Sequence, residues 1–386
     1  MGLHINLPRI LRVGGGVRRE LPQVLASLGV GNALLVADEY MVAQGQTEIL
    51  REALKAEGMS LRIFSGVVPD PTTESVAAGL KALAGGNHDV VIALGGGSAM
   101  DTAKLVAVMA GRTGLLRDYK VPATLDDGLP VVAIPTTAGT GSEVTRVAVV
   151  TDSESQEKML CMGLGLMPVA ALVDYELTLS MPYRLTADTG IDSLCHALEA
   201  YVSRKANAFT DGIALTAMAT IAGTLRTACA EPGNLAAREA MMLAATQGGI
   251  AFSNASVTLI HGMSRPIGAH FHVPHGLSNA MLLPEVTAWS VGSAPERYAD
   301  CARAMAMAAA GDSDALACQK LVAGLRELCL DLAVPGPEAF GIQRADWLAV
   351  LPLMAEQALV SGSPANNPRV PVADEIIDLY EKVWAA

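Results

Sequence analysis

Short apolar runs alternate with helix-like segments in the first half of the chain. The runs that we expect to form strands cover residues 33–38, 61–67, 89–97, 129–137, 144–152 and 171–177. Helix-like patterns separate most of them, up to about Ala56, from Thr73 to Leu83 and from Ser98 to Ala110. Because strands separated by helices of this length pair in parallel, the pattern predicts an α/β domain with a doubly wound parallel sheet.

Beyond about Thr186 the pattern changes to long stretches rich in alanine, leucine and methionine. We expect helices over residues 188–204, 208–230, 234–250, 297–310, 314–332, 344–359 and 373–385. Met181-Pro182 marks a hinge, since proline biases the preceding residue towards extended geometry. The sequence therefore predicts two domains, an α/β domain over 1–182 and an all-α domain over 183–386. We expect them to meet along a cleft, where ligands commonly bind.

Composition narrows the class of protein. Apolar residues make up 51% and charged residues 17% of the chain, as in a globular protein, and the formal net charge is −12. This charge disfavours nucleic acid and anionic membrane surfaces as partners. The N-terminal segment lacks the apolar core of a signal peptide, and no uninterrupted apolar run of ~18 residues occurs. The six cysteines form no CxxC pair, so we expect them to be reduced and the protein to be cytoplasmic.

Two glycine-rich loops follow predicted strands. In GGGSAMD, Gly95, Gly96 and Gly97 would let the backbone approach a phosphate, with Ser98 as the cap of a helix whose N-terminus attracts anions. The loop PTTAGTGSEVT (135–145) follows the next strand. Two such loops at neighbouring strand ends predict a dinucleotide at the carboxyl edge of the sheet. The first loop is not a G-x-G-x-x-G motif, and a tight turn that only packs is the alternative.

Asp38, at the end of the first predicted strand, bears on which nicotinamide cofactor is bound. A carboxylate there can accept hydrogen bonds from an adenosine ribose and would repel a 2′-phosphate, which favours NAD over NADP. The alternative is that Asp38 only caps the following helix. The glycines at 14–16 lack a recognisable strand–helix transition, and we expect them to form a turn near the N-terminus.

Four residues of the second half are candidate metal ligands. Asp192 and His196 are four residues apart in the helix-like TGIDSLCHALEAY, so both side chains project from one helix face. His261 and His275 bracket HGMSRPIGAHFHVPH, in a chain with only seven histidines. Three imidazoles and one carboxylate suit a borderline divalent ion such as Fe(II) or Zn(II). The sequence therefore predicts a metalloenzyme.

The motifs GGGSAMDTAK, AIPTTAGTGSEVT, LTADTGIDSLCHALEAYVS and HGMSRPIGAHFHVPHG together resemble the iron-containing (group III) alcohol dehydrogenases. The resemblance covers essentially the whole chain. It implies a dehydroquinate synthase-like architecture, with a dinucleotide-binding α/β domain, a helical metal-binding domain and assembly into a homodimer. It also implies that Asp192, His196, His261 and His275 hold the metal and that Gly95–Ser98 bind the cofactor pyrophosphate.

The resemblance further implies cofactor contacts from Asp70, Asp101, Thr136, Thr137, Thr140, Ser142 and Lys158. The implied activity is reversible hydride transfer between NAD and a small primary alcohol, diol or hydroxy acid, with the metal as Lewis acid. Alternatives are a glycerol-dehydrogenase-like or maleylacetate-reductase-like oxidoreductase, a synthase of the dehydroquinate type, and a non-catalytic NAD-binding assembly protein.

One position departs from the family pattern beside a ligand. Many relatives carry a second histidine four residues after the third ligand, where this chain has Arg265. Arginine cannot exchange protons near neutral pH, but it can hold a carboxylate, phosphonate or sulfonate of a substrate. The alternative is an ion pair with a nearby acid. His270 or His272 could assist proton transfer, or act only as structural hydrogen-bond donors.

Overall fold

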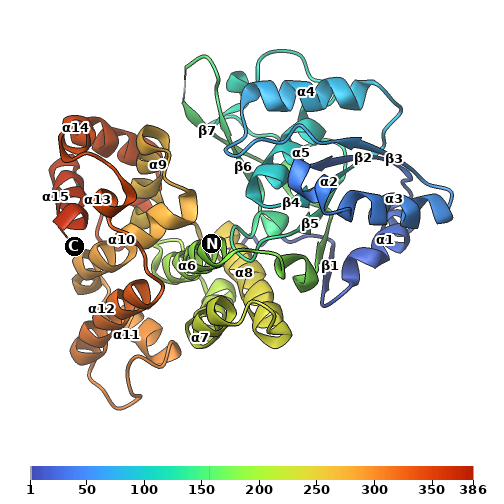
Figure 1. Cartoon of the computed structure of the whole chain (residues 1–386). Helices are drawn as coiled ribbons and strands as arrows, with labels where there is room; N and C mark the ends of the chain where they lie inside the picture. The colour runs from blue at the N-terminus through green and yellow to red at the C-terminus, as the bar shows by residue number, and fades with distance from the viewer. Residues whose placement is uncertain (1, 156, 386) are drawn as a thin grey trace. The chain divides into compact units, whose positions relative to one another are not determined.

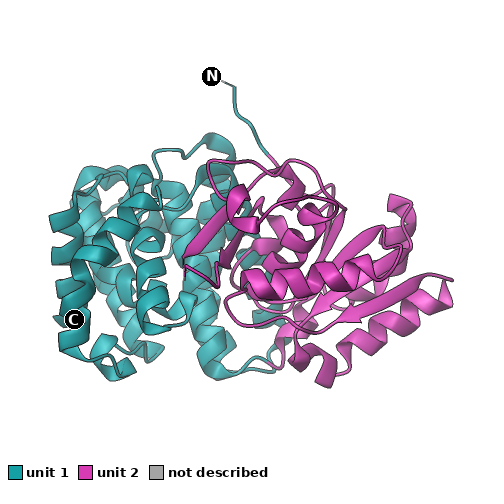
Figure 2. Cartoon of the chain, turned by 90° about the horizontal axis from the view of Figure 1, so that it is seen from above, with its two compact units in different colours: residues 1–5, 181–386 teal, residues 6–180 magenta. Residues whose placement is uncertain are grey.

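The computed structural model describes residues 2–155 and 157–385 as two compact units, coloured separately in Figure 2. One unit comprises Asn6–Ser180, and the other comprises Met181–Ala386 together with Met1–Ile5. This division lies close to the boundary expected after residue 182, although the sequence did not suggest that the first five residues group with the helical part. Pro182 is the N-cap residue of helix α6 (Tyr183–Val202).

The Asn6–Ser180 unit contains a six-stranded sheet in the order β1-β8-β5-β4-β2-β3 (Figure 1). All its neighbouring strands pair in parallel. The strands are β1 (Ile10–Val13), β2 (Asn32–Ala37), β3 (Ser60–Phe64), β4 (Val90–Gly95), β5 (Val131–Pro135) and β8 (Ala170–Val173). β4 and β5 are neighbours, so their carboxyl ends lie side by side at one edge.

Helices cover both faces of this sheet. Alternate strand residues such as Leu34 and Val91 pack with α4 and α5, whereas Leu35 and Ile92 pack with α1 and α3. The helices are α1 (Leu21–Leu28), α2 (Glu39–Ala43), α3 (Gln46–Ala56), α4 (Thr73–Ala84) and α5 (Gly97–Met109). Burial on both faces explains why the central strands are apolar without alternation. The doubly wound parallel sheet is therefore confirmed.

One prediction about strands is wrong. The segment 144–152 does not join the parallel sheet, because β6 (Val147–Thr151) pairs antiparallel with the unpredicted β7 (Lys158–Met162). The connection between them is too short for a parallel crossover, so only a hairpin is possible.

The glycines at 14–16 form a turn near the N-terminus, as predicted. The sequence did not show that this turn lies between a strand, β1, and helical turns, η1 (Val17–Glu20) and α1. Asp174 closes this turn by accepting hydrogen bonds from the backbone N–H groups of Gly16 and Arg18.

The second unit is helical, as predicted. Its helices are α6, α7 (Ala208–Ala230), α8 (Leu235–Ala255), α9 (Leu259–Phe271), α10 (His275–Ser290), α11 (Pro295–Ala304), α12 (Asp314–Asp331), α13 (Pro337–Phe340), α14 (Arg344–Val360) and α15 (Ala373–Ala385). α6 is almost entirely buried and packs against α7, α8 and α10. The sequence did not predict α9 or α10, and each contains an internal proline, Pro266 and Pro284.

By length and composition alone, α7 is the one helix of the described residues that could cross a membrane. It packs against α6 and α8, and such helices also occur in the cores of soluble proteins.

Candidate active site

The four candidate metal ligands come together inside the helical unit. Asp192 and His196 project from α6, His261 from α9, and His275 is the first residue of α10. From the Asp192 Oδ1 atom, the Nε2 atoms lie 3.4 Å away in His261, 3.7 Å in His275 and 3.9 Å in His196. Potential ligand atoms of Asp192, His261 and His275 all lie within 4.8 Å of one another. The His196 ring stacks on that of His261, with centroids 4.5 Å apart.

Asn279, which the sequence did not suggest, lies at the point where these atoms converge. Its Nδ2 donates to Asp192 Oδ1 over 2.6 Å and lies 3.2 Å from His261 Nε2 and 3.3 Å from His275 Nε2. Its Oδ1 is buried and has no hydrogen-bond partner among residues 2–155 and 157–385. The ligand atoms of Asp192, His261 and His275 therefore face one point, which already attracts the positive end of an N–H bond.

Glu199 fixes the orientation of one ligand. Its buried carboxylate lies 2.5 Å from His261 Nδ1 and accepts hydrogen bonds from Thr258 Oγ1 at 2.8 Å and from the Ile260 N–H at 2.7 Å. An acceptor on Nδ1 places the proton there and leaves the Nε2 lone pair facing Asp192, as in carboxylate–histidine–metal arrangements. The sequence analysis did not single out Glu199, although its position three residues after His196 on the same helix marks it as a neighbour of the candidate ligands.

The charges match the needs of a metal site. Burial alone would raise the pKa of Asp192, but the neighbouring histidines hold it well below its usual range. Burial lowers the pKa of His196 to about 3, whereas for His261 the carboxylates of Glu199 and Asp192 outweigh burial and raise the pKa to about 9. Asp192 is therefore anionic and His196 neutral near pH 7, which are the forms that bind metals, whereas His261 must release a proton when it binds one. One carboxylate and three imidazoles fit a borderline divalent ion.

The first glycine loop lies at the carboxyl end of β4, in the Asn6–Ser180 unit. Helix α5 begins at Gly97 with Gly96 as its N-cap, and no side chain among the described residues caps it. The expectation that Ser98 is the N-cap is therefore wrong, because Ser98 is already the second residue of the helix. Gly95 has φ +151°, and a Cβ there would lie 2.6 Å from the Ala99 Cβ. The first N–H groups of α5 are thus left available to an anion.

The second loop, which follows β5, packs against the first. The Thr136 N–H donates to the Gly95 carbonyl over 3.0 Å. A Cβ on Gly96 would lie 3.3 Å from Thr137, and one on Gly97 would lie 3.0 Å from Thr140. The two loops expected to hold a dinucleotide are therefore in contact at neighbouring strand ends.

Asp101 and Ser142 lie in a buried network beneath these loops. Asp101 accepts from Ser142 Oγ at 2.9 Å and from the Val149 N–H at 2.8 Å. Lys104, which the sequence analysis did not single out, donates to Ser142 Oγ at 2.8 Å and to the Thr145 carbonyl at 3.1 Å. Burial lowers the pKa of Lys104 to about 8, against the opposing charges of Asp101 and Glu143. In this structure the network holds the second loop on α5.

The remaining cofactor candidates lie in the same unit. Asp38 caps α2 by accepting from the Met41 N–H at 2.8 Å, and a further contact with a cofactor ribose stays a prediction. Its Oδ2 lies 3.6 Å from the position of a Cβ on Gly95, which places the carboxylate beside the first glycine loop. Lys158 and Asp70 form an ion pair of 3.1 Å. These positions are compatible with cofactor contacts, which stay predictions.

Comparison with known proteins decides the family. A family model described as iron-containing alcohol dehydrogenase matches residues 8–175, and one described as Fe-containing alcohol dehydrogenase family, C-terminal, matches residues 186–384. The chain belongs to the iron-containing alcohol dehydrogenase family.

Individual relatives of this alcohol dehydrogenase agree. The 1,3-propanediol dehydrogenase of Klebsiella pneumoniae is 37% identical over 361 residues, which are 92% of each chain. A solved 1,3-propanediol oxidoreductase superposes with a TM-score of 0.95 at 34% identity, covering 99% of this chain and 100% of that one. The sulfoacetaldehyde reductase of Bifidobacterium kashiwanohense, solved in complex with NAD+, gives 0.89 at 27% identity over 100% of both chains. The family resemblance, the fold class and the oxidoreductase class are thereby confirmed.

The environment of Arg265 bears on the two roles considered for it in this dehydrogenase. Its Nη1 donates to Ser363 Oγ over 3.2 Å, and no acid in the described part of the chain lies within ion-pair distance of it. Burial lowers the pKa of the guanidinium, and the negative charge of Glu199 still acts on it and opposes this lowering. The role of Arg265 therefore stays a prediction.

Both histidines proposed to assist proton transfer lie at the end of α9 that is far from His261. His270 lies in the last turn of α9, about 13 Å along the helix axis from His261, and its Nε2 is 2.9 Å from Gln357 Oε1. His272 is the C-cap of α9 with φ +54°. The exposed backbone position of His272 suits a structural role, while a role of His270 in proton transfer stays a prediction.

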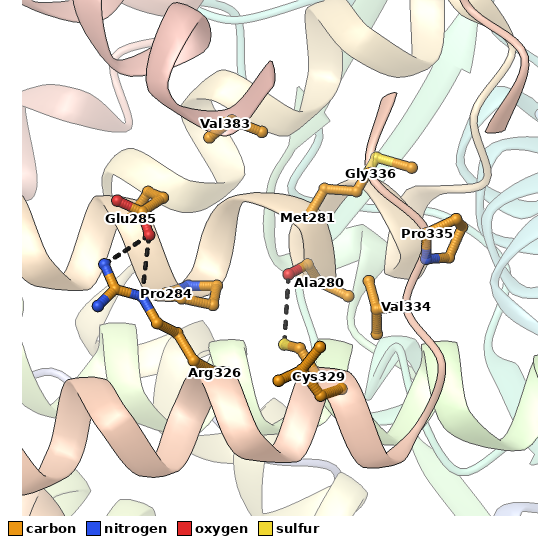
Figure 3. A pocket seen from close by; sticks show the side chains of 11 residues that line it. Ala280, Met281, Pro284, Glu285, Arg326, Cys329, Val334, Pro335, Gly336 and Val383 are labelled. Atoms are coloured by element: carbon orange, nitrogen blue, oxygen red, sulfur yellow. Dashed lines mark hydrogen bonds and ion pairs between the residues drawn. The ribbon is translucent and has the colours of Figure 1, made fainter. Parts of the chain in front are cut away.

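The helical unit also contains a cavity of about 380 Å³, and Figure 3 shows the side chains that line it. It lies between α10, α12, α15 and the segment 334–336. Its charged groups are already paired, since Arg326 donates to Glu285 at 2.7 Å, and Cys329 Sγ donates to the Ala280 carbonyl. Burial raises the pKa of Cys329 to about 12, so this thiol is a poor nucleophile. The cavity offers no arrangement for catalysis.

Proposed function

We propose that this enzyme catalyses reversible oxidoreduction between a small alcohol and its aldehyde, using NAD and a divalent metal held by Asp192, His196, His261 and His275. The observation that carries the proposal is that the Nε2 atoms of three histidines lie within 3.9 Å of the Asp192 carboxylate, in a chain of this family. Iron(II) fits these donors, as does zinc(II). When bound, the metal supplies Lewis acidity towards the substrate oxygen.

The residues around the site orient the reactants. Glu199 keeps the Nε2 lone pair of His261 directed towards Asp192, and the buried Asp192 supplies the negative charge of the ligand set. Gly95–Ser98 and the N-terminus of α5 are proposed to hold the pyrophosphate of the cofactor. Thr136, Thr137 and Thr140 are proposed to face the nicotinamide, and the Asp101–Ser142–Lys104 network to position their loop.

NAD is proposed over NADP because of Asp38. Its carboxylate lies beside the glycine loop and would repel a 2′-phosphate. The sulfoacetaldehyde reductase relative, solved with NAD+, supports the same choice.

Arg265 does not accept the proton of the alcohol, since an arginine side chain stays protonated near neutral pH. We propose that hydroxyl groups and solvent carry this proton, with His270 as the histidine to test. A His270→Ala variant that loses turnover while it still binds metal and NADH as tightly as the wild type would support its part in the relay.

The experiment is an assay of NADH and NADPH oxidation with a panel of short aldehydes, on protein loaded with Fe(II) or Zn(II). We expect turnover that depends on metal and prefers NADH. An Asp192→Asn variant should lose metal and activity while it still binds NADH. Absence of turnover with every aldehyde, despite bound metal and NADH, would contradict the dehydrogenase and favour a lyase-type synthase of related architecture.

Assembly and location stay proposals as well. We propose a cytoplasmic homodimer, and light scattering on the purified protein will give its mass in solution. The six cysteines form no disulfide in residues 2–155 and 157–385, and five of them are buried, which suits a reducing compartment.

A further inference from the structure

Arg265 lies one helical turn beyond a metal-ligand candidate. His261 and Arg265 are four residues apart on α9, so both project from the same face. Side chains on a helix lean towards its N-terminus, so the turn that carries His261 is within reach of the long Arg265 side chain. The negative charge of Glu199, which binds His261, also acts on the Arg265 guanidinium and opposes the lowering of its pKa by burial.

Arg265 has no ion-pair partner in the described part of the chain. Half-buried Arg265 donates one hydrogen bond, to a serine hydroxyl, and no carboxylate of the described residues lies within ion-pair distance. Glu199 is committed to His261, Thr258 and Ile260. Several other arginines of the helical unit form ion pairs within the described residues, for example Arg184 with Asp188 and Arg297 with Asp211, although buried Arg238 does not.

The rest of the guanidinium is not completely enclosed by the protein. Among the described residues, no Arg265 nitrogen is both fully buried and without a partner, so the nitrogens that do not bind Ser363 keep some exposure to solvent. An arginine that is partly desolvated and unpaired, with free N–H groups, is the arrangement that binds carboxylates and sulfonates with two parallel hydrogen bonds.

The surroundings hold Arg265 in place. Ser363 is buried and immediately precedes the turn η7 (Pro364–Asn366), which packs against α9. The packing is tight, because a Cβ on Gly262 would lie 2.7 Å from a Pro364 ring atom. Rigid support of this kind lowers the entropy cost of binding a ligand.

We infer that the substrate of this enzyme is a short aldehyde, or the matching alcohol, that carries an anionic group such as a carboxylate, sulfonate or phosphonate. Arg265 binds that group while the reacting carbon lies at the four-residue ligand set. This inference rests on the proposed function. In the reduction, hydride passes from NADH to the carbonyl carbon, a proton is added to the oxygen, and the anionic group is unchanged.

The test compares succinate semialdehyde, which is anionic, with butanal, a neutral aldehyde of equal chain length. We expect the wild type to favour succinate semialdehyde in kcat/KM. Arg265→Met should lower this preference about 10- to 100-fold, the range for hydrogen bonds to a charged group, and mainly through KM. Arg265→Lys, which keeps the charge without the planar fork, should lie between them. The control is Arg326→Met, since Arg326 pairs with Glu285 away from the ligands, and it should leave the preference unchanged.

A binding measurement separates this inference from the proposed function. Propanesulfonate is a weak metal ligand, and calorimetry on the metal-loaded protein with NAD+ should show that it binds wild type at least 10-fold more tightly than Arg265→Met. A wild type without preference for the anionic aldehyde, or a preference that Arg265→Met leaves intact, overturns the inference while the dehydrogenase stands. If no aldehyde is reduced, the proposed function fails, and equal binding of propanesulfonate to both proteins would then overturn the inference as well.

Discussion

Replacing Glu199 by glutamine changes the proton on a metal ligand with little change of shape. In the wild type, one carboxylate oxygen lies 2.5 Å from His261 Nδ1, while the other accepts from Thr258 at 2.8 Å and from Ile260 at 2.7 Å. The carbonyl oxygen of glutamine can keep the last two hydrogen bonds. Its NH2 group would then face Nδ1 and can only donate. His261 must therefore move its proton to Nε2, the nitrogen that faces Asp192.

The expected loss follows from this exchange. A histidine protonated on Nε2 cannot bind a metal through that atom, and loss of such a supporting carboxylate typically costs 10- to 100-fold in metal affinity. This corresponds to about 1.4 to 2.8 kcal/mol. The stability of the metal-free protein should fall by about 1 to 3 kcal/mol, since a buried charged hydrogen bond is replaced.

Titration of the metal-free protein with Zn(II) in a chelator buffer measures this affinity. The matched control is Asp174→Asn, which also converts a fully buried carboxylate to an amide, at the turn formed by Gly16 and Arg18 in the other unit. The control should lose stability but keep its metal affinity. If Glu199→Gln binds metal as tightly as the wild type, the assigned tautomer of His261 is wrong.

Three further predictions test the proposed cofactor contacts and the shifted pKa values of the ligand histidines. Gly95→Ala should weaken NADH binding at least 10-fold without changing metal content, because its φ is +151° and its Cβ would meet that of Ala99; unchanged NADH affinity in calorimetry would contradict the phosphate site. Asp38→Asn keeps a good helix cap, so unfolding should change by only tenths of a kcal/mol, while the NADPH-to-NADH ratio of kcat/KM rises; an unaltered ratio would mean that Asp38 is only a cap. For the metal-free protein, we expect the free energy of unfolding in urea to be highest near pH 6.5. A free energy of unfolding that still rises towards pH 9 would contradict the shifted pKa values of His261 and His196. The raised pKa of His261, about 9, gives stability that is lost as pH rises from 6.5 to 9, and the lowered pKa of His196, about 3, gives stability that is lost as pH falls from 6.5 to 3.

The sequence predicted those parts of the fold in which the local pattern and the environment agree. Buried strands such as β4 are apolar throughout because helices cover both sheet faces, and the long helices of the second unit carry strong propensity. β1 was missed because it is an edge strand with exposed residues. α9 and α10 were missed because prolines, glycines and histidines obscure their periodicity.

The candidate site shows the same limit. Asp192 and His196 were found from their spacing within one helix. Glu199 and Asn279 act through partners that are 62 and 87 residues away in the chain. The spacing of Glu199 from His196 on α6 marks it as a neighbour of the ligands, but it does not show the contact with His261, and no local pattern marks Asn279. The environment of Arg265 likewise depends on Ser363, which is 98 residues away.

The central claim is that four side chains of the helical unit hold one divalent ion. Anomalous X-ray diffraction at the iron and zinc edges, from crystals of the metal-loaded enzyme, tests it directly. We expect a single strong peak of anomalous density at about 2.0 to 2.2 Å from an Asp192 oxygen and from nitrogens of His196, His261 and His275. A peak that lies beyond bonding distance of any two of these side chains, or the absence of a peak beside the Asn279 amide, would contradict the proposed metal site.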